Sequence, residues 1–139
     1  MTAKQYLSQI RILDTKINIK TQELKELRCK IEGLSSLVLM ADKVQSSPIH
    51  DKISGDIAKL LELEAQIVCE NKELEKLKHK IINEIAELKN PLFIKILFKR
   101  YVEFKSLERI AADLNYSYIH IRREHGYALE VFKNQILKR

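Results

Sequence analysis

Residues 107–126 read Leu-Glu-Arg-Ile-Ala-Ala-Asp-Leu-Asn-Tyr-Ser-Tyr-Ile-His-Ile-Arg-Arg-Glu-His-Gly, and no other stretch of the chain is as informative. Two helices can cross closely through a short turn when a small residue lies midway along the first helix, as Ala111 does. Asn115 is the non-glycine residue best suited to the positive φ of such a turn. Ser106 and Ser117 stand where each helix needs an N-cap. The stretch therefore predicts a helix-turn-helix.

Apolar residues on both predicted helices can pack against each other. They are Ile110, Leu114, Tyr116 and Ile121. We also expect Tyr101, Tyr116 and Tyr127 in the core, and His125 as a packing or hydrogen-bonding residue. Glu124 departs from the pattern, because an apolar residue is usual at its position. Either Tyr127 and Ala128 provide that packing, or Glu124 pairs with a neighbouring cation.

The second helix of such a motif enters the DNA major groove with its first turns nearest the bases. Arginine pairs with guanine edges, and an apolar side chain such as Ile119 can contact a thymine methyl group. Lys105, Arg109 and Tyr118 are candidates for phosphate contacts. Two alternatives stay open: Arg122 and Arg123 could form a solvated helix face, and His120 could be structural. The candidate DNA-binding residues are Ser117, Tyr118, Ile119, His120, Arg122, Arg123, Lys105 and Arg109.

The basic charge of the chain is concentrated around this motif. The net charge is +6; residues 1–89 hold 15 Lys and Arg against 14 Asp and Glu, whereas residues 90–139 hold 10 against 5. The C-terminal third thus carries +5. This asymmetry indicates a polyanionic partner, although charge alone fits a solvated basic face equally well.

Asn90-Pro91 marks the boundary before the motif. Proline is well tolerated in a first helical turn, so a new helix can begin there. The strongly apolar segment 92–101 that follows is typical of the core helix of a compact domain. We therefore predict a helix-turn-helix domain over residues 91–139.

The chain before this boundary has a seven-residue repeat. Residues spaced alternately by three and four form an apolar stripe from Ala3 to Leu34, broken by Lys20. A second stripe includes Ile57, Leu60, Ile67, Leu74, Ile81, Ile85 and Leu88. We expect helices at about 3–33 and 52–89 joined by a connector at 34–51. Its apolar residues Leu37, Val38, Leu39 and Met40 should fold back on the hairpin tip or meet a partner.

The predicted fold is therefore all-α: a long antiparallel helical hairpin of coiled-coil type over residues 1–89, followed by the compact helix-turn-helix domain. A two-helix hairpin buries little apolar surface, so we expect it to pair with another copy or with the C-terminal domain. A homo-oligomer is expected, with a dimer favoured over larger assemblies.

Composition narrows the function classes. No apolar run is long enough to span a membrane, and the N-terminus lacks the apolar core of a signal peptide, so a cytoplasmic protein is expected. Cys29 and Cys69 match no metal-ligand spacing and are expected to be buried apolar residues. No motif for phosphate cradling, zinc binding or nucleophilic catalysis is present. We expect neither an enzyme nor a cofactor or metal.

Residues 92–132, including Phe-Lys-Arg-Tyr-Val-Glu-Phe-Lys-Ser-Leu-Glu-Arg-Ile-Ala-Ala-Asp-Leu-Asn-Tyr-Ser, resemble the C-terminal promoter-reading domain of bacterial sigma factors. The whole chain also resembles a family of small phage and prophage proteins from Gram-positive bacteria. That match is carried by Asp-Lys-Val-Gln-Ser-Ser-Pro-Ile-His-Asp-Lys at 42–52 and His-Gly-Tyr-Ala-Leu at 125–129. The resemblance implies a phage transcription regulator in a bacterial host cell.

Three functions remain open at this point. The first is a sequence-specific transcription regulator that binds double-stranded DNA, with residues 1–89 assembling the protein or contacting RNA polymerase. The second is a small DNA-recognition subunit of a viral DNA-packaging machine. The third is a coiled-coil adaptor whose basic end faces an acidic protein.

Overall fold

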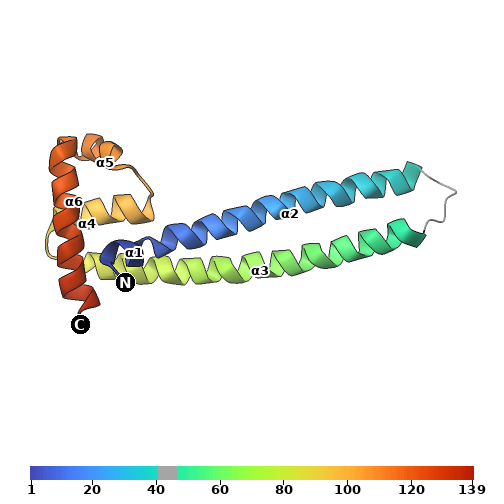
Figure 1. The fold of residues 1–139 in the computed structure, drawn as a ribbon, viewed down its shortest axis with the longest axis horizontal. Coiled ribbons are helices and arrows are strands. Elements are labelled where there is room, and N and C mark those ends of the chain that lie inside the picture. Colours follow the sequence, from blue (N-terminus) through green and yellow to red (C-terminus); the bar gives the residue numbers. More distant parts are fainter. Residues whose placement is uncertain (41–46) are drawn as a thin grey trace. The chain divides into compact units, whose positions relative to one another are not determined.

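The computed structural model describes residues 1–40 and 47–139, with side chains described for 1–34 and 51–139. Within these residues the fold is all-α, as predicted, with a long helical hairpin and a compact helical C-terminal part (Figure 1). The elements are α1 (Ala3–Leu7), α2 (Gln9–Met40), α3 (Ser47–Ala86), α4 (Pro91–Leu97), the π-helical turn η1 (Phe98–Val102), α5 (Leu107–Leu114), α6 (Tyr118–Phe132) and the π-helical turn η2 (Lys133–Leu137).

The two long helices extend further toward each other than the sequence predicted. Residues 34–40, assigned to the connector, continue α2 to Met40, and α3 begins at Ser47 instead of residue 52. Pro48 is the second residue of α3, where its missing N–H has no intrahelical acceptor to lose. Helix α3 also ends earlier than predicted, at Ala86. The packing expected of the apolar side chains 37–40 lies outside the described residues.

The chain divides into two compact units. We call Met1–Asp14 together with Glu73–Arg139 the compact unit, and Thr15–Lys72 the hairpin arm. Residues at both ends of the predicted hairpin, 1–14 and 73–89, thus belong to the same unit as the C-terminal residues. Contacts between residues that are far apart in the sequence hold the compact unit together. The ring of Tyr6 lies 6.0 Å from that of Phe132, and its hydroxyl donates to Glu84 Oε2 at 2.7 Å.

Helices α2 and α3 run antiparallel along the hairpin arm (Figure 1). Ile17, Leu24 and Leu63 are buried in the seam between them. Ion pairs between the two helices flank these apolar contacts: Lys20 with Glu70, Arg28 with Glu64, and Lys30 with Asp56 at 3.7 Å. The arm therefore has an apolar seam that is bordered by ion pairs and that buries one carboxylate, that of Asp56.

Two predictions about the arm were wrong. Ile57 was placed in the buried stripe, but it is 41% exposed, while Asp56 beside it is only 5% exposed. One residue along a helix rotates a side chain by about 100°, so this shift moves Ile57 off the seam. Cys29 and Cys69 were expected to be buried, but both are exposed. The spacing of apolar residues by three and four did not distinguish residues buried in the seam from exposed residues beside it.

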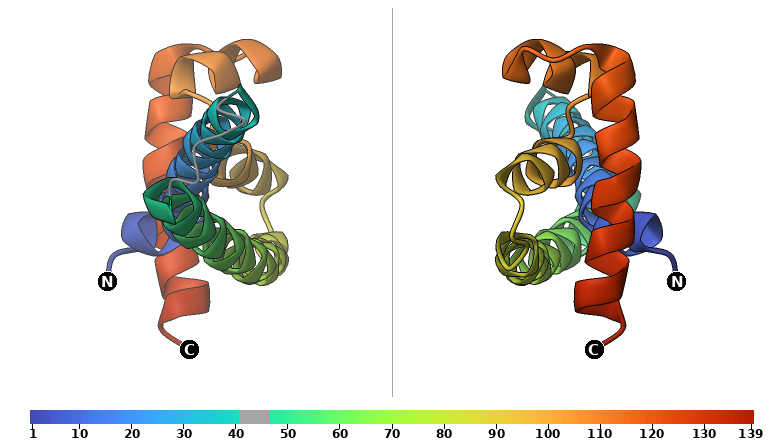
Figure 2. Two further views of the ribbon diagram at one scale, coloured as in Figure 1. Left: turned by 90° about the vertical axis from the view of Figure 1, so that its right-hand side faces the viewer. Right: turned by 90° about the vertical axis from the view of Figure 1, so that its left-hand side faces the viewer.

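The centre of the helix-turn-helix is a small apolar core. Ile96 of α4, Ile110 and Ala111 of α5 and Ile121 of α6 are buried against one another. Asn90 caps α4 by accepting from the Leu92 N–H at 2.9 Å, and Pro91 follows as the first helical residue, as predicted. Figure 2 shows α5 lying across the N-terminal end of α6. This core fixes the first turns of α6 against α4 and α5.

Candidate functional site

The α5–turn–α6 segment has the local geometry that its sequence predicted. The hydroxyl of Ser106 accepts from the Arg109 N–H, and that of Ser117 from the His120 N–H, each at 3.2 Å. Asn115 adopts the left-handed conformation with φ 59° and ψ 40°. The Tyr116 N–H then donates to the Ala111 carbonyl at 2.9 Å, which closes the turn. Each helix end has a polar partner, so the turn is held by hydrogen bonds within itself.

The first two turns of α6 are divided into a buried and an exposed face. Ile121 is fully buried, whereas Ile119 is 70% exposed and Tyr118 is 41% exposed. Arg122 and Arg123 are also exposed. Side chains three and four residues apart share a helix face, so Ile119, Arg122 and Arg123 lie together opposite the core. The structure thus presents two guanidinium groups and an apolar side chain on one surface.

Tyr116 and His120 lie beside this surface rather than in the core. Tyr116 was predicted as a core anchor but is 46% exposed, and its ring lies 4.8 Å from that of His120. His120 is half-buried. Tyr116 directly follows the left-handed Asn115. Ser117 of the candidate set serves as the N-cap, and its hydroxyl oxygen accepts from the His120 N–H.

The prediction that Tyr127 is a core residue was also wrong. Tyr127 is 51% exposed, while its neighbour Ala128 is fully buried. Of the two residues considered as replacements for an apolar residue at Glu124, only Ala128 packs in the core. Glu124 itself is half-buried.

Lys105 and Arg109 belong to an ion cluster around Asp113. Lys105 Nζ lies 3.0 Å from both Asp113 Oδ2 and Glu103 Oε2, Arg109 Nε lies 3.4 Å from Asp113 Oδ1, and Lys99 Nζ completes the set at 4.0 Å. The hydrogen bond from Lys105 lowers the pKa of Asp113, and the bonds to Asp113 and Glu103 raise the pKa of Lys105. Three cations against two carboxylates leave the cluster with a net positive charge.

This cluster was not foreseen from the sequence. Only the Arg109–Asp113 pair carried a local signal, because residues four apart on a helix are neighbours. Lys105 precedes α5, and Lys99 lies in η1. Their approach depends on the loop between η1 and α5, where Phe104 has φ 59° and Arg100 donates to the Lys105 carbonyl at 3.0 Å.

Behind the motif, Tyr101 and His125 form a partly buried polar pair. The Tyr101 hydroxyl and His125 Nε2 are 2.8 Å apart, with ring centroids at 5.7 Å. Burial, together with the charges of Arg100 and Lys4, lowers the pKa of His125 to about 4. Burial raises the pKa of Tyr101 to about 12. Both groups are therefore neutral at pH 7, and His125 is a hydrogen-bonding residue, as predicted.

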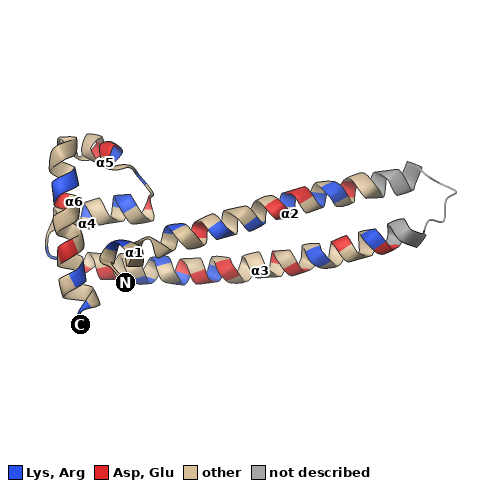
Figure 3. Ribbon diagram, viewed as in Figure 1, with Lys and Arg blue, Asp and Glu red and all other residues tan. Residues whose placement is uncertain are grey.

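Figure 3 shows Lys and Arg interspersed with Asp and Glu along α2 and α3. Within residues 1–40 and 47–139, no three His, Cys, Asp or Glu side chains are grouped so that they could hold a metal ion. No described helix combines the length and apolar character needed to cross a bilayer.

Comparison with family models, with curated proteins and with solved structures finds no significant match. The function of the site is therefore inferred from its own residues.

Proposed function

We propose that the protein is a sequence-specific, DNA-binding transcriptional regulator of phage or prophage type, with a sigma-like helix-turn-helix. Helix α6 lies in the major groove, and the hairpin arm serves assembly or contacts RNA polymerase. The observation that carries the proposal is the exposed face of α6, where Ile119, Arg122 and Arg123 lie opposite the buried Ile121. Its capped first turns are the part of such a helix that approaches base edges.

The chemistry of this face fits base recognition. A guanidinium group donates two parallel hydrogen bonds to the O6 and N7 atoms of guanine, and an apolar side chain contacts the methyl group of thymine. Ile119 is 70% exposed, so its burial against DNA removes apolar surface from water. The core beneath Ile121 holds this face in place before DNA arrives, which reduces the entropy lost on binding.

The ion cluster around Asp113 provides phosphate contacts at the edge of the same motif. Arg109 is 69% exposed at its side chain and lies on the first turn of α5. Lys105 is one-third exposed and remains cationic, because its carboxylate partners raise its pKa. A phosphate can bind Arg109 or Lys105 while the other cations continue to balance Asp113. Such contacts position the protein without reading sequence.

Fluorescence anisotropy with labelled duplex DNA tests the proposal. We expect binding that weakens steeply as salt is raised, because cationic side chains displace counterions from the phosphates. Arg122→Ala and Arg123→Ala should each cost about 1–3 kcal/mol on a preferred sequence. Lys76→Ala is the matched control, since Lys76 is an exposed cation on α3 far along the chain from the motif. An absence of salt-dependent binding to any duplex contradicts the proposal.

A further inference from the structure

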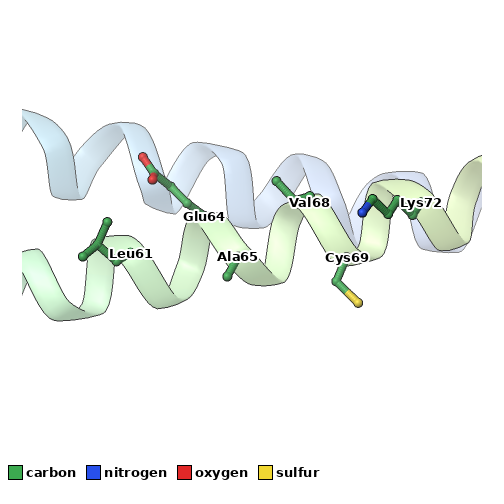
Figure 4. Close-up of a pocket in the computed structure, with 6 residues that line it drawn as sticks. All are labelled: Leu61, Glu64, Ala65, Val68, Cys69 and Lys72. Atoms are coloured by element: carbon green, nitrogen blue, oxygen red, sulfur yellow. The ribbon is translucent and has the colours of Figure 1, made fainter.

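The outward face of α3 in the hairpin arm carries a shallow groove of about 510 Å³ (Figure 4). It is lined by Leu61, Glu64, Ala65, Val68, Cys69 and Lys72. These residues form two rows with a spacing of four: Leu61, Ala65 and Cys69 in one, and Glu64, Val68 and Lys72 in the other. Rows at this spacing are the ridges that α-helices pack into one another's grooves.

The groove exposes apolar side chains that a seam would normally bury. Leu61 is 60% exposed and Val68 is 54% exposed, and Ile57, one turn before Leu61, is 41% exposed. Ala65 between them is small, so a second backbone can approach closely there. Contiguous exposed apolar residues on one face of a helix are typical of a surface that binds another protein.

We propose that this groove binds the same groove of a second copy of the chain, so that the protein is a dimer through its α3 helices. The charges at the two ends of one row, Glu64 and Lys72, favour a second copy of the chain as the binding partner. Glu64 and Lys72 stand four residues before and after Val68. A twofold axis at Val68 therefore sets Glu64 of each copy beside Lys72 of the other. An interface with twofold symmetry requires such self-complementarity.

The position of Glu64 is compatible with this second contact. It pairs with Arg28 of α2 within the arm, and its side chain remains 36% exposed. A carboxylate has two oxygens and can accept from two cations at once. Arg28, Glu64 and the Lys72 of the second copy would then form a three-membered ion network at each end of the interface. This dimer does not depend on the proposed DNA binding.

Sedimentation equilibrium of the full chain tests the interface. We expect a dimer for the unmodified protein. Val68→Asp should weaken the affinity of the dimer by at least about 100-fold, because two carboxylates would be buried without partners. Ile19→Asp is the matched control: Ile19 is 64% exposed on α2 and lies outside the groove. Circular dichroism should show both variants equally helical, since neither side chain is in the seam.

A charge exchange distinguishes self-association from binding of another protein. Lys72→Glu should weaken the dimer about tenfold, because two attractive pairs become repulsive. The double variant Glu64→Lys, Lys72→Glu restores opposite charges across the twofold axis and should recover most of the affinity. If the groove binds a different protein, the double variant should not recover the affinity for that protein.

Cysteine cross-linking locates the axis. Cys69 is one residue from Val68, so the two Cys69 residues of a dimer are offset by only about 3 Å along the helix. A short bis-maleimide should join two copies of Cys29→Ser through Cys69, but not two copies of Cys69→Ser, which retains exposed Cys29. An unmodified chain that stays monomeric at the highest concentration that sedimentation can measure, or a dimer that persists in Val68→Asp, overturns the proposal.

Discussion

The core of the helix-turn-helix and the seam of the hairpin arm are both built from apolar residues on helices, but they are stabilised differently. The core residues Ile96, Ile110, Ala111 and Ile121 are all apolar and enclosed by three helices. The arm has only two helices, buries Asp56 beside its apolar residues, and has three ion pairs that border the seam. Enclosure gives stability to the first, whereas polar contacts in the second favour one register at a cost in stability.

This difference matches what each region has to do under the proposed function. A helix that reads bases must present its side chains in a fixed geometry, and the enclosed core provides this for α6. The arm has a different requirement, because a long seam between two helices can slip by a turn unless polar contacts specify the pairing. Three predictions break or sharpen the comparison.

The largest effect is expected from removing the same side-chain volume in each region. Ile121→Ala should lower the opening free energy of the helix-turn-helix by about 4 kcal/mol, because an enclosed core cannot collapse around the cavity. Ile17→Ala in the arm should cost about 2 kcal/mol, since two helices bordered by solvent can close the gap. Amide hydrogen exchange measures each region separately. Equal losses would contradict the contrast between the two regions.

A smaller effect is expected from pH in the compact unit. The pKa of His125 is about 4 when folded and 6.5 as its ordinary value, so the folded state binds this proton more weakly. The contribution of His125 to stability is therefore fully present above about pH 6.5 and is lost as the pH falls toward 4. Allowing for partial exposure, the loss is on the order of 1–2 kcal/mol.

The variant that isolates this effect is His125→Gln, which should flatten the pH dependence of stability between pH 6.5 and 4. His79→Gln is the control, because His79 is exposed on α3. Urea denaturation at several pH values makes the measurement. If His125→Gln keeps the full acid-induced loss, the Tyr101–His125 pair is not its source.

The smallest effect concerns the polar contacts of the arm. Asp56 is 5% exposed, and its Oδ2 accepts no hydrogen bond from the described residues, although Lys30 lies 3.7 Å away. Replacing it by an apolar residue removes a desolvated charge, so Asp56→Leu should stabilise the arm by about 1 kcal/mol. Asp51→Leu, at an exposed position, should change stability by less than about 0.5 kcal/mol. Thermal unfolding compares the two; a large loss in Asp56→Leu would mean that the ion pair stabilises the arm.

Local backbone chemistry made the helix-turn-helix predictable. Ser106, Ser117 and Asn115 each have a side chain or conformation suited to a single position in such a turn, and each occupies it. Ile110, Ala111 and Ile121 follow from the same spacing. The exposed Tyr116 was not predictable in this way, because aromatic character does not tell whether a residue beside a turn points inward.

Contacts between distant segments could not be read from the sequence. The apolar spacing of residues 3–10 is the same as that of the rest of the first stripe, yet Tyr6 contacts Phe132 and Glu84 in the compact unit. The one-residue shift that buries Asp56 in place of Ile57 is likewise set by how α2 and α3 meet. The ion cluster around Asp113 depends on a loop whose conformation no local pattern encodes.

The most direct test of the central claim is selection from random duplex DNA with the full chain, repeated with Arg122→Ala and Arg123→Ala. We predict an enriched sequence motif that each variant loses or relaxes at its own base positions, with two half-sites if the protein is a dimer. Binding without enrichment would limit the protein to phosphate contacts, as in a packaging role. Failure to recover any duplex at low salt would contradict DNA recognition by α6 and would favour a protein partner for its basic surface.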